Sequence, residues 1–231
     1  MSHFDFKKFR IEQDRCAMKV GTDGVLLGAW AEGGRRILDI GTGTGVIALM
    51  MAQRYPEARV TAIDIDAAAV EQANENVQDS PFAERIQVSQ ADVNAFETLE
   101  PYDAIVCNPP YFDKALTCPD NQRTQARHTT SLSYQQLMTA ACRLLQDEGV
   151  FSLIIPNDFF QQLESELHLA GLFLTRVYGV RTVEGKPIKR YLIELRKSPK
   201  NELVKKEVLI DDAPNVRSEW YRELTKDFYI K

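Results

Sequence analysis

Short runs of apolar, often β-branched residues alternate with longer amphipathic segments through the first two thirds of the chain. The short runs are typical of buried strands, and the longer segments carry apolar residues at helical spacing. The pattern predicts strands over residues 35–41, 59–65, 85–91, 102–108 and 150–156. It predicts helices over residues 45–55, 67–78, 133–146 and 158–171, the third of them ending at Gly149. Alternating strands and helices indicate βαβ units, so we expect a parallel sheet with right-handed crossovers.

The last third of the chain breaks this alternation. Two β-like runs, 172–183 and 186–197, are joined by Glu184-Gly185 with no helix between them. So short a connection requires an antiparallel pair. We therefore predict an α/β fold with a seven-stranded, mostly parallel sheet that finishes in an antiparallel hairpin at one edge.

The two ends of the chain are expected to belong to the same unit. A length of 231 residues favours a single domain over two. Within it, residues 1–34 form an N-terminal extension that contributes to the ligand site, and residues 200–231 form a C-terminal tail. Residues 218–231 predict a short helix whose aromatic face packs on the core.

A glycine-rich loop follows the first predicted strand, with Gly41, Thr42, Gly43 and Gly45 in succession. Glycine is needed where the chain turns tightly and its backbone approaches a ligand closely. Dinucleotide-binding folds use G-x-G-x-x-G, whereas this loop reads G-x-G-x-G with Asp39 two positions ahead. That variant resembles the loop that binds S-adenosylmethionine. Asp39 can attract the cationic amino group of the methionine moiety, or it can brace the loop.

Two further carboxylates follow the next two predicted strands. Asp64, with Ile65 after it, ends the second strand about 20 residues beyond the loop, where an acidic residue binds ribose hydroxyls in nucleotide-binding sheets. Asp92 and Val93 follow the third strand, where the adenine amino group lies in the methyltransferase arrangement. Either aspartate alone would more often be a turn residue or a helix cap. Together they predict a cofactor site at the carboxyl edge of the sheet.

The segment before the first strand adds candidates for the methionine end of the cofactor. Lys19, Gly21, Thr22 and Asp23 precede an apolar helical stretch. In amino methyltransferases this segment lines the cofactor. The alternative is that Thr22 or Asp23 caps the helix.

The motif that predicts the reaction is Asn108-Pro109-Pro110-Tyr111, directly after the fourth strand. An exocyclic amino nitrogen delocalises its lone pair into the ring and is a poor nucleophile. Two acceptors aimed at its N–H groups, the Asn108 side-chain carbonyl and the Pro109 backbone carbonyl, would expose that lone pair. Paired prolines stiffen the loop, and Tyr111 would stack on a flipped planar acceptor. Asn108 would also border the cofactor.

These motifs resemble the class I amino methyltransferases that act on N6 of adenine, N4 of cytosine or N5 of glutamine. The run from Gln13 to Trp30, with the ending from Leu224 to Tyr229, resembles more narrowly the bacterial valine-tRNA N6-adenine methyltransferases. The resemblance implies a Rossmann-like fold, S-adenosylmethionine as the cofactor, and a tRNA substrate methylated at adenosine 37 beside the anticodon.

Three other functions remain open. A protein glutamine methyltransferase acting on a release factor would share the motif, but only about 35 residues precede the first strand here, too few for the usual substrate-binding domain. A DNA or rRNA amino methyltransferase is possible, although no target-recognition domain is apparent. A non-catalytic RNA-binding module is disfavoured because Asn108 and Tyr111 are intact.

Composition bears on metals, membranes and compartment. The four cysteines lie far apart without a C-x-x-C pair, and the three histidines are isolated, so we expect reduced thiols and no metal site. No run approaches the roughly 20 apolar residues of a membrane span. We expect a cytoplasmic monomer without a membrane partner.

Basic residues are unevenly distributed despite a net charge of −5. The basic stripe, from Arg176 to Lys206, holds ten basic residues and three acidic ones. It can meet RNA phosphates, or it can be a solvated edge strand whose lysines deter pairing. The RNA-binding candidates in the stripe, near the start and after the N-P-P-Y motif are Lys7, Lys8, Arg10, Arg123, Arg127, Lys186, Lys189 and Arg190.

Overall fold

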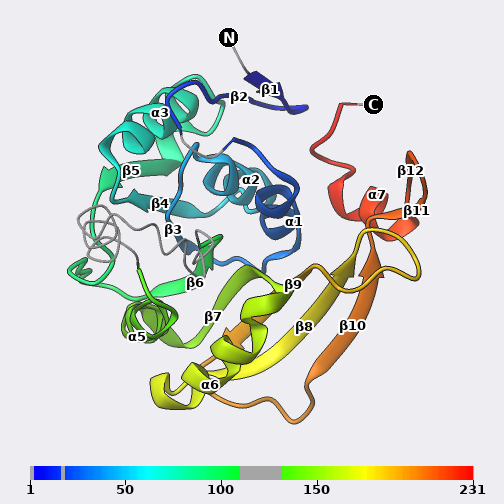
Figure 1. The fold of residues 1–231 in the computed structure, drawn as a ribbon. Helices are drawn as coiled ribbons and strands as arrows, with labels where there is room; N and C mark the ends of the chain where they lie inside the picture. Colours follow the sequence, from blue (N-terminus) through cyan, green and yellow to red (C-terminus); the bar gives the residue numbers. More distant parts are fainter. Residues whose placement is uncertain (1–2, 17–18, 110–131, 231) are drawn as a thin grey trace, which may run out of the picture.

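A central eight-stranded β-sheet organises the computed structural model, which describes residues 3–16, 19–109 and 132–230 (Figure 1). The strands lie in the order β10-β8-β9-β7-β6-β3-β4-β5. In chain order they are β3 (Arg36–Ile40), β4 (Arg59–Asp64), β5 (Ile86–Gln90), β6 (Tyr102–Cys107), β7 (Leu145–Pro156), β8 (Phe173–Arg181), β9 (Arg190–Arg196) and β10 (Val204–Leu209).

The strands from β3 to β7 are parallel, as the alternating pattern predicts. The helices are α1 (Thr22–Trp30), α2 (Val46–Arg54), α3 (Ala67–Gln78), α5 (Tyr134–Leu144), α6 (Phe160–Ala170) and α7 (Glu219–Thr225). Successive strand residues point to opposite faces: Val106 packs with α1 and α2, whereas Ile105 packs with α5 and α6. Both faces of these strands are therefore buried, which explains their continuous apolar runs.

The predicted antiparallel hairpin is present but does not form the edge of the sheet. β8 pairs antiparallel with β9, and β9 also pairs antiparallel with β7, so β9 lies inside the sheet. The strand β10 then adds parallel to β8, which makes eight strands rather than the predicted seven. Lys205 and Lys206 are exposed on β10, and Val208 is its buried residue. This strand was missed because an edge strand rich in charge has little apolar pattern.

The boundary between the third predicted helix and the fifth predicted strand is also different from the prediction. Helix α5 begins with a capping box between Ser133 and Gln136, and it ends at Leu144 instead of continuing to Gly149. β7 starts at Leu145, whose side chain is fully buried. A Cβ at Gly149 would lie 2.7 Å from the Leu145 side chain, so this glycine permits close packing within the strand and is not a helix cap.

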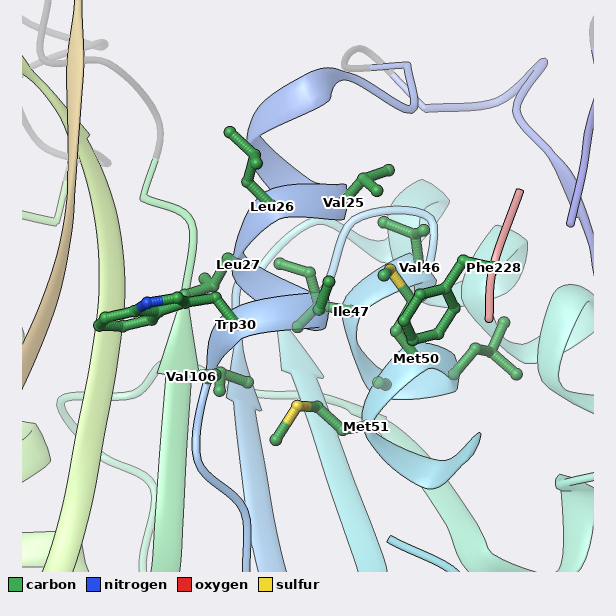
Figure 2. Packing of buried hydrophobic residues seen from close by; sticks show 14 of the residues in the cluster. Val25, Leu26, Leu27, Trp30, Val46, Ile47, Met50, Met51, Val106 and Phe228 are labelled. Atoms are coloured by element: carbon green, nitrogen blue, oxygen red, sulfur yellow. The ribbon is translucent and has the colours of Figure 1, made fainter. Parts of the chain in front are cut away.

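The N-terminal and C-terminal segments of the described chain pack together. An N-terminal hairpin of β1 (His3–Asp5) and β2 (Arg10–Glu12) meets the C-terminal tail through a bridge between Phe6 and Tyr229. The tail also contains the short strands β11 (Asp211–Ala213) and β12 (Val216–Arg217). Phe228 belongs to the same buried cluster as Val46 and Met50 of α2 (Figure 2). An aromatic residue of the tail is thus buried against α2.

Replacing Phe228 by alanine is expected to lower the free energy of unfolding by about 3–5 kcal/mol, because the ring is fully buried. Denaturant unfolding followed by circular dichroism measures the loss. The control is Ile230→Ala in the same tail, where the side chain is 61% exposed and a change within about 0.5 kcal/mol is expected. Equal losses in the two variants would contradict this packing.

Candidate active site

A cavity of about 610 Å³ lies where β3, β4, β5 and β6 end. Open α/β sheets bind ligands at this carboxyl edge. Its walls combine apolar side chains such as Ile40 and Ile65 with carboxylates that follow the strands. The predicted cofactor residues that line it are Lys19, Gly21, Thr22, Asp23, Gly41, Thr42, Gly43, Asp64, Ile65, Asp92, Val93 and Asn108. The structure therefore brings most of the predicted site together.

The glycine loop presents its backbone to this cavity. Gly41 and Gly43 have φ angles of 71° and 55°, in the left-handed region that favours glycine. Gly41 and Thr42 donate their amides to the Ile63 carbonyl of β4 at 2.9 and 3.0 Å. A Cβ at Gly41 or Gly43 would meet no atom within 4 Å among the described residues, so the space beside the loop is open to a ligand.

Asp39 lies beneath this loop and is not among the residues that line the cavity. Its Oδ2 accepts hydrogen bonds from Thr42 Oγ1 at 2.7 Å and from the Ala48 amide at 3.1 Å. Its Oδ1 is buried and has no hydrogen-bond partner among the described residues. Burial raises the pKa of Asp39 to about 7, against the lowering effect of these two hydrogen bonds. This geometry corresponds to a carboxylate that braces the loop. Gly45, with a φ of 82°, is likewise outside the cavity lining and is the N-cap residue of α2.

Asp64 and Asp92 are held differently from Asp39. Asp64 accepts from the Gly43 amide at 2.9 Å and from the Asp66 amide at 3.0 Å, so it ties the glycine loop to the end of β4. Asp92 is exposed, and its Oδ1 accepts from the backbone amide and side chain of Asn94, each at 2.9 Å. Both carboxylates line the cavity and can accept hydrogen bonds from a ligand's hydroxyl or amino groups.

The segment before α1 does not cap its helix with a side chain. Gly21 occupies the N-cap position, and no side-chain hydrogen bond caps it. Asp23 instead forms an ion pair with Arg190, the first residue of β9. Arg190 also lines the cavity. Burial lowers the pKa of Arg190, but a guanidinium stays charged at neutral pH.

The N-P-P-Y motif begins at the same cavity. Asn108 follows β6, lines the cavity and is half-buried, and Pro109 is buried. The other predicted residues of this region, Pro110, Tyr111, Arg123 and Arg127, lie outside the described residues. Asn108 thus places an amide side chain beside the cavity that the glycine loop borders.

Sequence reasoning missed several lining residues because they belong neither to the glycine loop nor to the N-P-P-Y motif. Cys16, Asp66, Asn94 and Gln136 line the cavity from four different segments. Burial raises the pKa of Cys16 to about 11, so this residue is a neutral thiol at physiological pH. Within the described ranges, no three His, Cys, Asp or Glu side chains are grouped as metal ligands would be.

The predicted RNA-binding residues separate into two kinds. Lys7, Lys8, Lys186 and Lys189 are exposed, and Arg10 is exposed but bonded to a carboxylate of β1 at 2.6 Å. Arg190 does not lie on the surface with them, because its side chain turns into the cavity and is 21% exposed.

Other arginines of the basic stripe are engaged within the fold. Arg176 pairs with Glu194 at 2.9 Å and covers the ring of Trp30. Arg181 and Arg196 also form ion pairs, with Glu207 and Glu32. The stripe is therefore not one continuous set of free charges.

Comparison with known proteins identifies the class of this fold and site. Residues 20–175 match the family model described as "Methyltransferase small domain", so the chain is a methyltransferase. A curated relative from Phocaeicola vulgatus is 49% identical, covering 99% of this chain and 97% of the relative. Another from Bacteroides thetaiotaomicron is 46% identical, covering 98% and 97%. Both are named tRNA1(Val) (adenine(37)-N6)-methyltransferase, and the chain belongs to this family.

A solved structure supports the fold independently. The crystal structure of a predicted O-methyltransferase from Agrobacterium tumefaciens superposes with a TM-score of 0.69 at 19% identity, covering 89% of this chain and 96% of the other. The predicted Rossmann-like class I methyltransferase fold is confirmed. None of the helices in the described ranges is both long and apolar enough to cross a membrane.

Replacing Asp39 by asparagine tests the buried carboxylate. The pKa of Asp39 is about 7 in the folded chain, against an ordinary 3.8, so the folded state holds the extra proton. The resulting stabilisation is complete below the unfolded pKa and is lost as the pH rises through the folded pKa. Asparagine cannot ionise, so the stability of Asp39→Asn relative to the unaltered chain is expected to rise by about 3 kcal/mol between about pH 5 and pH 8.

Urea unfolding at several pH values measures this difference. The matched control is Asp92→Asn, which alters an exposed carboxylate at the same edge of the sheet. If the difference in unfolding free energy between Asp39→Asn and the unaltered chain did not change with pH, protonation of Asp39 would not be linked to folding.

Proposed function

We propose that this chain transfers the methyl group of S-adenosylmethionine to N6 of adenosine 37 in a valine tRNA. The relatives that match nearly its whole length are named for that reaction. The observation that carries the proposal is Asn108, which lines the cofactor cavity directly after β6. The enzyme would act as a single-domain monomer in the cytoplasm, where tRNA is found.

The residues around the cavity fit the proposed cofactor. The open space beside Gly41 and Gly43 admits a ligand close to the backbone. Asp64 would bind the ribose hydroxyls, and Asp92 would accept from the adenine amino group. Ile65, which is 55% exposed and lines the cavity, offers an apolar surface for the base. The bound cofactor supplies an electrophilic methyl group on its sulfonium.

The chain's contribution to the reaction is to prepare the acceptor nitrogen. The Asn108 side-chain carbonyl and the Pro109 backbone carbonyl would accept hydrogen bonds from the N6 amino group. These bonds favour a tetrahedral nitrogen whose lone pair points out of the ring plane, and positioning then lowers the barrier to transfer. Tyr111 would stack on the adenine after the base leaves the anticodon loop. No general base is required before methyl transfer.

The exposed lysines offer a surface for the tRNA backbone. Lys186 and Lys189 lie between β8 and β9, next to Arg190 at the cavity, and Lys7 and Lys8 lie in the N-terminal hairpin. Lysines contact phosphates without reading sequence. In this proposal they orient the tRNA, while the anticodon loop reaches the N-P-P-Y motif.

The substrate assignment is tested with labelled S-adenosylmethionine and four acceptors: unmodified valine tRNA, the same tRNA with guanosine at position 37, DNA and a release factor. We expect N6-methyladenosine in the first tRNA alone, detected by nucleoside mass analysis. Label in the release factor or DNA would replace the tRNA assignment with one of the related amino methyltransferase activities.

Asn108→Ala is expected to lower kcat for tRNA methylation by about 100- to 1,000-fold, because one of the two acceptors for the amino group is lost. The matched control is Asn157→Ala. That asparagine is exposed, follows the neighbouring strand β7 and does not line the cavity. Unchanged kcat in Asn108→Ala would rule out the proposed acceptor role.

Charge reversal at Lys186 and Lys189 is expected to weaken tRNA binding and to flatten its dependence on salt. Each lost phosphate contact reduces the slope of log K against log salt by about one. Filter binding across a salt series measures both effects. Affinity and slope equal to those of the unaltered chain would exclude these two lysines from the tRNA interface.

A further inference from the structure

An ion pair links two distant segments at the wall of the cofactor cavity. Asp23 lies in the first turn of α1, and Arg190 begins β9. The contact joins Oδ1 of the aspartate to Nη1 of the arginine. Both residues line the cavity, and their side chains are 12% and 21% exposed. The pair is thus largely shielded from bulk water, yet it borders the space that a ligand would fill.

The other charges around the cavity make Arg190 distinctive. Asp64, Asp66 and Asp92 also line the cavity, so carboxylates outnumber cations among its described charged residues. Lys19 is the other cation of the described lining, and it is exposed. A ligand carboxylate entering this cavity would meet repulsion from the aspartates, except beside a cation. Arg190 is the cation that combines shielding from water with a position in the wall.

The chemistry of the guanidinium suits a second anionic partner. Arginine presents five N–H donors in a planar fork that matches a carboxylate. The contact with Asp23 is made through Nη1, and no other acceptor among the described residues bonds to this side chain. Donors of Arg190 therefore remain for a ligand, and Asp23 brings a negative charge to the same place.

We propose that Arg190 binds the α-carboxylate of the cofactor's methionine moiety and that Asp23 faces its ammonium group. The amino acid end of S-adenosylmethionine is a zwitterion with both charges attached to one carbon. The Asp23–Arg190 pair presents the opposite charges side by side, so one internal pair is exchanged for two charge-matched contacts. The inference rests on the proposed use of S-adenosylmethionine, and it assigns Arg190 to the cofactor instead of to RNA.

Three ligands separate the parts of the cofactor in a calorimetric binding experiment on the full chain. S-adenosylhomocysteine carries both charges of the amino acid. Decarboxylated S-adenosylmethionine keeps the ammonium but lacks the carboxylate, and 5′-methylthioadenosine lacks both. Arg190→Gln is expected to bind S-adenosylhomocysteine about 10- to 100-fold more weakly, because it loses a charge-assisted hydrogen bond to the carboxylate. Its affinity for 5′-methylthioadenosine is expected to be unchanged, and decarboxylated S-adenosylmethionine should show no weakening.

Two further variants supply the controls for affinity. Arg59→Gln makes the same change at an exposed arginine that begins β4 and does not line the cavity, and its affinity for S-adenosylhomocysteine should equal that of the unaltered chain. Lys19→Gln tests the other cation of the described lining. If this variant, and not Arg190→Gln, lost affinity only for the ligand that carries the carboxylate, the proposal would be overturned. Retained binding of 5′-methylthioadenosine by Arg190→Gln shows that the cavity is folded.

The remaining outcomes are distinct from one another. Equal weakening of all three ligands by Arg190→Gln would indicate a purely structural ion pair and would overturn the inference. If Arg190→Gln lost tRNA affinity but kept its affinity for S-adenosylhomocysteine, Arg190 would be a tRNA-binding residue and the inference would be overturned. If the unaltered chain bound none of the three ligands, the cofactor assignment would fail and this inference with it. If it bound S-adenosylhomocysteine as tightly as Arg190→Gln does, the inference alone would fail.

Discussion

The geometry of the cofactor loop depends on one buried carboxylate. Asp39 receives a side-chain donor from Thr42 in the loop and a backbone donor from Ala48 in α2, both on the same oxygen. Burying a carboxylate without a cation is costly, and two hydrogen bonds offset only part of that cost. In return, β3, the loop and α2 are fixed relative to one another. The Gly43 amide can then reach Asp64, which ties the loop to β4.

The parallel part of the sheet was predictable because its apolar pattern is unambiguous. Strands buried on both faces need continuous apolar runs, and in this part of the chain such runs alternate with helical segments. The errors fall where local pattern and tertiary position disagree. β10 is charged and exposed, so only its pairing with β8 identifies it as a strand. Leu144 and Leu145 are both buried, so hydrophobicity alone cannot tell where α5 ends and β7 begins.

The site could be predicted where a motif fixes both residue type and position, as for Gly43, Asp64 and Asn108. The roles of the charged residues could not be predicted from the sequence, because they depend on which strands pair. Arg176 and Glu194 lie directly opposite each other in the β8–β9 register, and this pairing removes the arginine from the exposed basic stripe. The density of charge along the sequence treats Arg176 as equivalent to Lys186. In the structure Arg176 is partly buried and paired, whereas Lys186 is exposed.

The position of Arg190 also bears on how a charged cofactor can bind against a cavity wall whose own charges are already paired. A partly buried ion pair contributes little net free energy, because desolvation offsets most of the Coulombic attraction. Separating Asp23 from Arg190 is therefore inexpensive when each side chain gains a new partner of opposite charge. In the proposed arrangement the zwitterion supplies both partners together, and a ligand with only one of the charges leaves the other side chain unmatched. The wall thus favours the complete amino acid end over fragments of it, and it does so without a net change in the charge of the cavity.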